Sequence, residues 1–132
     1  MENLTKTKKV IGGDDSAVIK KYIYGYEGGR CLEMDENSVV RSGTVILRTY
    51  DGKFKPAPVT GNVYNYKSTD KNEKVAGILY GAVTSPRQAA SIMTWGVVNS
   101  KLLPYPLTAD IKAALPYIDE MSDEDETWEH QD

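Results

Sequence analysis

The sequence predicts a mainly β fold with one short helix near the carboxyl end. Three features indicate this: strongly apolar runs at residues 75–83 and 91–98, a hairpin pattern at residues 44–55, and a helix pattern that begins at Thr108. The apolar runs are rich in β-branched or aromatic residues and are bounded by turn residues, which favours buried strands over helices. A chain of 132 residues fits one domain, and at that size it can bury a core without disulfides or metals.

Both faces of the first apolar run are unsuited to water. Alternation places Val75, Leu79 and Val83 on one face of a strand, and Ile78 and Tyr80 on the other. A short chain must cover both faces of such a strand. The pattern does not distinguish between two ways to bury the second face, a contact with another subunit and packing under the protein's own loops.

The first 37 residues are predicted to be an amino-terminal arm. Residues 1–15 are polar and lysine-bearing and contain Gly12 and Gly13, which indicates a segment without packed structure of its own. Residues 16–24 then carry β-type side chains, and the glycines that follow break the strand. Two interpretations stay open: this strand seeks a partner outside the domain, or it is the first strand of the domain's own sheet.

A hairpin is predicted at residues 44–55. Residues 44–50 alternate in the manner of a half-buried strand, and Asp51 with Gly52 supplies the positive φ angles of a tight turn. The return strand is short because Pro56 and Pro58 cannot donate to a ladder. Residues 61–74 are polar and are predicted as a surface loop that leads to the central strands.

The helix pattern follows a proline-stiffened crossing. Thr108 can cap it, Asp110 lies in its first turn, where the helix dipole favours an anion, and Pro116 stops it. Ile111 and Leu115 share one face of this helix. A helix so short is not stable alone, so we expect it to dock on the sheet.

Charge divides the chain into a basic body and an acidic tail. Residues 119–132 hold eight of the 19 Asp and Glu residues and none of the 16 Lys and Arg residues, which leaves the rest with a net charge of about +5. Such a composition does not bury enough apolar surface to offset its ordering entropy. We therefore predict a disordered acidic tail at residues 119–132.

The residues needed for catalysis or metal binding do not occur in the required patterns. The single histidine, His130, lies in the tail, and the single cysteine, Cys31, has no histidine beside it. The carboxylates at residues 123–126 lack the spacing of a calcium loop, and no glycine cluster has the context of a phosphate loop. No run approaches the ~20 apolar residues of a membrane span. We expect no enzyme activity, no cofactor, no metal, no small-molecule substrate and no membrane contact.

Aromatic residues suggest one binding function of a different class. Nine tyrosines, two tryptophans and a basic body are compatible with a single-stranded nucleic-acid-binding module, an OB-like barrel with an acidic regulatory tail. Tyr22, Tyr24 and Tyr26 lie close to Lys20 and Lys21. The central runs, however, lack the interleaved basic residues of a stacking platform. Hydrophobic anchoring at a protein interface explains the tyrosines as well.

The order of motifs in residues 38–118 is more specific than any one of them. A strand and an Asp-Gly-Lys turn at residues 41–56 precede Ala-Gly-Ile-Leu at residues 76–79. Residues 91–99 then end in Gly-Val-Val-Asn, and a short alanine-rich helix pattern follows at residues 108–115. In this order the motifs resemble the head decoration proteins of tailed phages, of the lambdoid type.

The resemblance implies a β-clip-like fold, a small barrel or mixed sheet sealed by the short helix, as a decoration domain at residues 38–118. It also implies a virion structural protein, made in the host cytoplasm, that stabilises the capsid. The partners would be the major capsid protein and two further copies in a homotrimer at local threefold positions on the outer capsid surface, with no nucleic acid bound. The arm would add a strand to the capsid protein. The expected capsid-binding residues are Val18, Ile19, Tyr22, Ile23 and Tyr24, and the expected oligomer interface contains Leu79, Tyr80, Met93 and Trp95.

Overall fold

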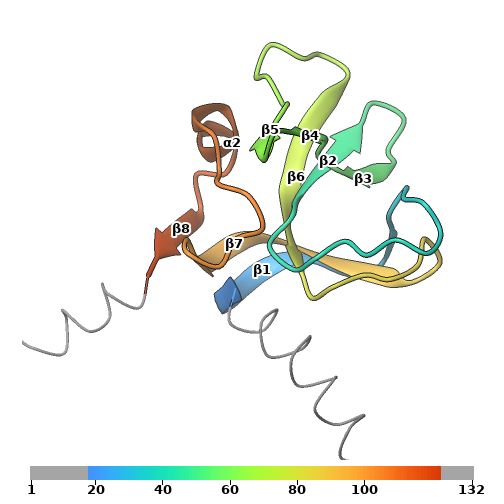
Figure 1. Ribbon diagram of the computed structural model, residues 1–132, viewed down its shortest axis with the longest axis horizontal. Helices are drawn as coiled ribbons and strands as arrows, with labels where there is room; N and C mark the ends of the chain where they lie inside the picture. The colour runs from blue at the N-terminus through green and yellow to red at the C-terminus, as the bar shows by residue number, and fades with distance from the viewer. Residues whose placement is uncertain (1–17, 123–132) are drawn as a thin grey trace, which may run out of the picture.

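The computed structural model describes residues 18–122 and is mainly β, which confirms the predicted fold class (Figure 1). Its main sheet has the strand order β1-β7-β6-β2-β3, with β8 paired to β7 off this path. These strands are β1 (Ile19–Cys31), β2 (Val45–Thr49), β3 (Phe54–Pro56), β6 (Glu73–Tyr80), β7 (Ala89–Asn99) and β8 (Ile118–Met121). A small second sheet pairs β4 (Val59–Thr60) with β5 (Val63–Tyr64). The sheets are not closed into a barrel, so the mixed-sheet form of the prediction is correct and the barrel forms are not.

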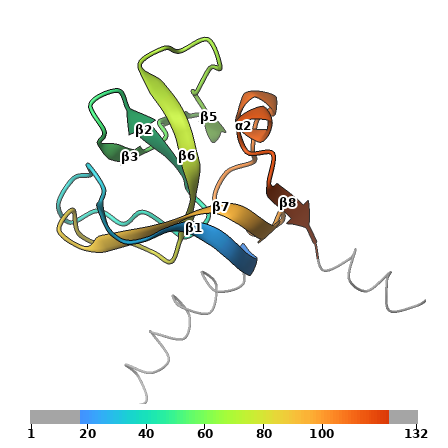
Figure 2. The same ribbon diagram turned by 180° about the vertical axis from the view of Figure 1, so that it is seen from behind.

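The main sheet is built around β7. One edge of β7 pairs antiparallel with β1. The other edge pairs antiparallel with β6 at residues 91–93 and in parallel with β8 at residues 96–99. Figures 1 and 2 show β1 and β7 as a long ribbon below the other elements, with β2, β3 and β6 toward one end and β8 and α2 toward the other. The predicted strand at residues 91–98 is thus confirmed as β7. The one predicted at residues 75–83 is confirmed as β6 only up to Tyr80, because Gly81 has a φ of 91° and Val83 forms an isolated bridge with Val40.

The predicted hairpin is confirmed as β2 and β3. Arg48 lies opposite Phe54, and the turn between them contains Gly52 at a φ of 86°. The backbone N–H of Lys53 donates to the Thr49 hydroxyl over 3.1 Å, which closes the turn. Ala57 N–H still donates to Val45 O over 2.8 Å, and pairing ends there because Pro58 has no N–H to donate.

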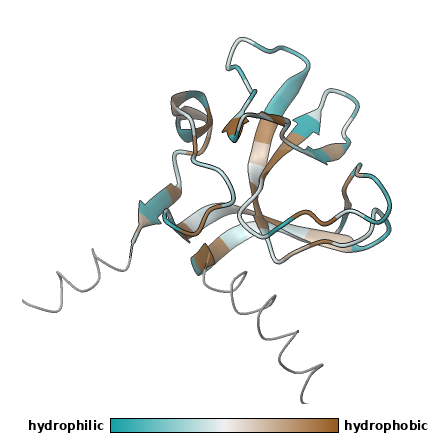
Figure 3. Ribbon diagram, viewed as in Figure 1, coloured by the Kyte–Doolittle hydropathy of each residue, from teal (hydrophilic) through white to brown (hydrophobic). Residues whose placement is uncertain are grey.

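Two hydrophobic cores lie on the two faces of the sheet. Ile78 and Met93 belong to the first, and their neighbours Leu79 and Ile92 belong to the second, as strand alternation requires. Loops and α2 (Ala109–Ala114) cover the first core, and the segment from Leu32 to Val40 helps to cover the second. Figure 3 shows the apolar segments of β2 and β6 near the middle of the molecule and hydrophilic residues in the outer loops. The protein's own chain therefore covers most of both apolar faces, while Tyr80 at the end of β6 stays 48% exposed.

The helix forms where its capping pattern predicts. Thr108 is the N-cap, and its hydroxyl accepts a hydrogen bond from the Ile111 N–H over 3.4 Å. Ile111 and Leu115 are buried in the first core. This docking stabilises a helix of six residues that would not form in isolation.

Of the two interpretations left open for residues 16–24, the structure supports the first strand of the domain's own sheet, because β1 pairs with β7 in the main sheet. The predicted arm at residues 1–37 therefore needs correction. The residues of β1 pair with β7 from Ile19 opposite Val98 to Cys31 opposite Ala89. The long apolar edge of β7 lies in the same chain, and pairing with it buries Val18 and Ile19 in the first core. The domain therefore begins well before residue 38. Residues 1–17 of the predicted arm lie outside the described residues.

The boundary of the predicted acidic tail also needs correction. Residues 118–121 form β8, whose Met121 O accepts from Ser100 N–H over 2.8 Å. This strand occupies the edge of β7 beyond the last β6 pair, and Ile118 packs against the first core. Glu120 also pairs with Lys112 over 3.3 Å. Two acidic residues are thus accommodated in an ordered strand, while residues 123–132 lie outside the described residues.

Candidate interaction surface

A β-bulge in β7 turns Trp95 away from the first core. Across the β1–β7 pair, Gly25 lies opposite Met93 and Tyr24 lies opposite Trp95, so Thr94 is an extra residue. Met93 and Val98 consequently lie in the same core although plain alternation would place them on opposite faces. Trp95 lies on the other face, where 49% of its surface is exposed.

Three exposed aromatic residues adjoin one another at this end of the sheet. Tyr24 is directly opposite Trp95 in the strand register, and the Trp95 and Tyr117 ring centroids are 5.9 Å apart. Tyr24 is 67% exposed and Tyr117 is 65% exposed. We name Tyr24, Trp95 and Tyr117 the aromatic face. Single exposed apolar residues are ordinary, whereas adjoining aromatic residues are typical of protein interfaces.

The aromatic face adjoins an open edge of the sheet. β1 is the end strand of the sheet order, so within residues 18–122 no strand pairs with its outer edge. Ile23 on this strand is 42% exposed. An end strand offers backbone N–H and C=O groups to a strand from another protein.

Three of the five predicted capsid-binding residues lie inside the domain. Val18 is 1% exposed and Ile19 is 7% exposed, and Tyr22 packs against the first core with its ring 4.9 Å from that of Tyr80. Val18 and Ile19 cannot contact another protein while the domain is folded, because they hold β1 to the core. Ile23 and Tyr24 remain available on the surface.

Two of the four predicted oligomer residues are likewise corrected. Leu79 and Met93 have no exposed surface and lie in different cores, since the protein's own loops and helix cover both faces of β6 and β7. Tyr80 and Trp95 are about half exposed, at 48% and 49%. They lie on opposite faces, because Tyr80 stacks on Tyr22 on the first-core face.

Sequence reasoning missed Tyr117. It lies between Pro116 and the buried-side residue Ile118, at the entry to β8, where its backbone C=O accepts from Gly96 N–H over 3.1 Å. An exposed aromatic residue next to an apolar residue is the alternation of a strand, and that pattern was the available signal.

The described residues show no arrangement of a metal centre. Between residues 18 and 122 no three His, Cys, Asp or Glu side chains come together as metal ligands. Burial raises the pKa of Tyr64 to about 12. The Tyr64 hydroxyl accepts from Val45 N–H over 3.1 Å, so this tyrosine has a structural role in the first core.

Residues 18–122 also contain no helix with the length and apolar character needed to cross a bilayer. Comparison of the chain with protein families, with curated proteins and with solved structures gave no match.

Proposed function

We propose that the protein is a virion structural protein, a head decoration protein that binds the outer surface of the expanded capsid as a homotrimer at local threefold positions. The order of motifs in residues 38–118 supports this proposal from the sequence. The single structural observation that carries it is the aromatic face next to the open edge of β1. This surface offers apolar burial and backbone pairing at the same place.

The major capsid protein is the partner that we assign to this surface. A strand of that protein would pair with the outer edge of β1, while Tyr24 and Trp95 become buried against it. Trp95 was expected in the subunit contact, but because it lies opposite Tyr24 we assign it to the proposed capsid contact instead. Burying one large aromatic side chain stabilises a contact by roughly 1.5–3 kcal/mol.

The subunit contact of the homotrimer is assigned to Tyr80. Its ring lies at the end of β6, half exposed, and it is held by stacking on Tyr22. Because Tyr80 and Trp95 lie on opposite faces, one residue can meet a second copy while the other meets the capsid. A symmetric trimer uses each contact three times, so weak contacts add up.

A single-stranded nucleic-acid-binding module is the second candidate, favoured by the exposed rings of Tyr24 and Trp95. The charges beside the aromatic face do not form a basic track. Lys21 and Asp119 lie on the two sides of Val97, one basic and one acidic. Nucleic-acid grooves combine stacking rings with a run of positive charge.

Co-sedimentation with expanded empty capsids of the parent phage tests the proposal. The full chain should pellet with expanded shells up to a fixed number of copies per shell, and retention on single-stranded DNA should be negligible at every salt concentration. Failure to pellet with expanded shells would overturn the proposal. Tight DNA retention that falls steeply with salt would support the second candidate.

A further inference from the structure

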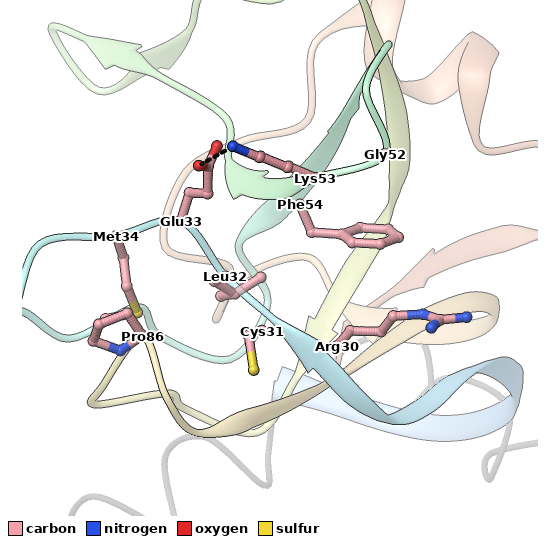
Figure 4. A pocket seen from close by; sticks show the side chains of 9 residues that line it. All are labelled: Arg30, Cys31, Leu32, Glu33, Met34, Gly52, Lys53, Phe54 and Pro86. Atoms are coloured by element: carbon pink, nitrogen blue, oxygen red, sulfur yellow. Dashed lines mark ion pairs between the residues drawn. The ribbon is translucent and has the colours of Figure 1, made fainter.

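A pocket lies at the opposite end of β1 and β7 from the two chain ends of the described structure. Its volume is about 660 Å³, and Cys31 on its wall is opposite Ala89, the first residue of β7. The floor contains apolar side chains, with Leu32 and Phe54 buried and Met34 and Pro86 partly buried, and the rest of the lining is largely polar and charged (Figure 4). A floor of this kind accepts an apolar or aromatic side chain from a ligand.

Positive charge is fixed at the rim of this pocket. The Arg30 guanidinium carbon lies 5.3 Å from the Tyr26 ring centroid and 5.8 Å from that of Phe54. No carboxylate in the described part of the chain forms an ion pair with Arg30, whereas Lys53 pairs with Glu33 over 3.6 Å. Because two rings hold the guanidinium in place, it loses little freedom when it binds a carboxylate. The pocket therefore fits an aromatic side chain with acidic neighbours.

The chain itself contains a segment of that chemistry. Residues 123–126 are Asp-Glu-Asp-Glu, and Trp128 follows after one threonine. The proposed function uses neither this segment nor the pocket. The positively charged rim of the pocket is complementary to the acidic residues of this segment. The apolar residues of the pocket are complementary to its one large aromatic residue.

A chain cannot fill its own pocket with its own Trp128. β8 ends at Met121 opposite Asn99, the last residue of β7, whereas the pocket lies beside Ala89. Ten strand residues at ~3.3 Å each separate these points by roughly 33 Å. Trp128 follows Met121 by seven residues, which span at most ~25 Å when extended. The tryptophan must come from another molecule.

We infer that the pocket binds residues 123–128 of a second copy of this chain, with Trp128 on the apolar floor and the acidic residues against Arg30. This contact is head-to-tail, so it joins different surfaces of the two copies and can link successive molecules. It goes beyond the proposed capsid function and does not depend on it.

A thiol trap tests the contact in the full chain. Cys31 is the single cysteine, so oxidation of the unmodified chain can give only symmetric dimers. The variant Glu129→Cys adds a thiol beside Trp128, and mild oxidation should link it to Cys31 of the next molecule and give a ladder of dimers, trimers and larger species. The same variant with Arg30→Glu should give little or no ladder. A Glu129→Cys variant that yields dimers alone overturns the inference.

A peptide titration measures the same contact without covalent chemistry. A fluorescein-labelled peptide of residues 123–132 should bind the full chain saturably in fluorescence anisotropy. Arg30→Ala should weaken binding roughly three- to fivefold, as expected for an exposed ion pair. Replacing Trp128 by alanine in the peptide should weaken binding more than about tenfold. Arg41→Ala is the matched control, because Arg41 is also exposed but does not line the pocket. Equal affinity for the Arg30→Ala and Arg41→Ala variants overturns the inference.

Discussion

Met93 and Trp95 are two residues apart in β7 but lie in different environments. Met93 has β6 on one side, β1 on the other and a core on each face of the sheet, and none of its surface is exposed. Trp95 lies after the bulge at Thr94, and 49% of its surface is exposed. An apolar side chain belongs to the core if another segment of the same chain packs over it. It is available for an interface if no such segment does. The middle of the sheet therefore stabilises the fold, and its β1–β7–β8 end is available to a partner.

The largest expected effect separates these two regions by stability. Met93→Ala should lower the free energy of unfolding by about 2–5 kcal/mol, because it leaves a cavity in the first core. Trp95→Ala should lower it by less than about 1 kcal/mol, because the ring is half exposed. Urea unfolding of both variants checks this. Similar losses for the two would mean that Trp95 also belongs to the core.

Truncation tests how far the stabilising region extends along β7. Ending the chain after Ile118 removes most of β8 and its hydrogen bond to Ser100 N–H, which should cost about 2–3 kcal/mol. Ending it after Ser122 removes only residues outside β8 and should cost almost nothing. Thermal melting of the two truncated chains gives the comparison. Identical melting would show that β8 contributes no stability.

The buried Tyr64 should make a contribution to stability that is lost at high pH. Burial, opposed by the Val45 N–H and assisted by Tyr105, raises the pKa of Tyr64 to about 12 from 10.0 in the unfolded chain. The folded state therefore favours the neutral phenol. Its contribution is fully present below pH 10 and is lost as the pH rises through 12, by up to ~2–3 kcal/mol in total.

Unfolding free energies measured between pH 9 and 11.5 should fall more steeply for the unmodified chain than for Tyr64→Phe. Parallel slopes for the unmodified chain and Tyr64→Phe would contradict the assignment.

The smallest expected effect concerns the helix that covers the first core. Thr108→Ala removes the acceptor for the Ile111 N–H and should cost about 1 kcal/mol. Thr108→Asn keeps an N-cap acceptor and should cost much less. Chemical unfolding measures both, and an alanine variant as stable as the asparagine variant would rule out a capping contribution.

Local patterns predicted the elements whose causes are local. The turn at Asp51 and Gly52 and the cap at Thr108 depend on a few adjacent residues. Both formed, although only Gly52 of the turn has the predicted positive φ and Asp51 does not. The bulge at Thr94 has no local mark in the sequence, because it arises from the register between β1 and β7. The exposure of Trp95 could therefore not be distinguished from the burial of Met93.

Pairing between distant segments limited the rest of the prediction. β1 finds its partner about seventy residues later in the chain, and β8 joins β7 in parallel despite its two acidic residues. Composition placed the residues of β8 in a disordered tail and left the place of β1 open, since it does not show which sheet edge is open. Tyr24 and Trp95 were identified from the sequence, whereas Tyr117 depends on the position of β8 and was missed.

Capsid occupancy of a Trp95→Ala variant tests most directly whether the aromatic face is a docking surface separate from the fold. Tyr50→Ala is the matched control, because Tyr50 is 85% exposed and lies in the β2–β3 turn. In co-sedimentation with expanded empty capsids, we expect Trp95→Ala to bind at least about tenfold more weakly than the unmodified chain. Tyr50→Ala should bind normally, and both variants should keep a cooperative melting transition. Full occupancy by a folded Trp95→Ala variant would contradict the assignment of this surface to the capsid.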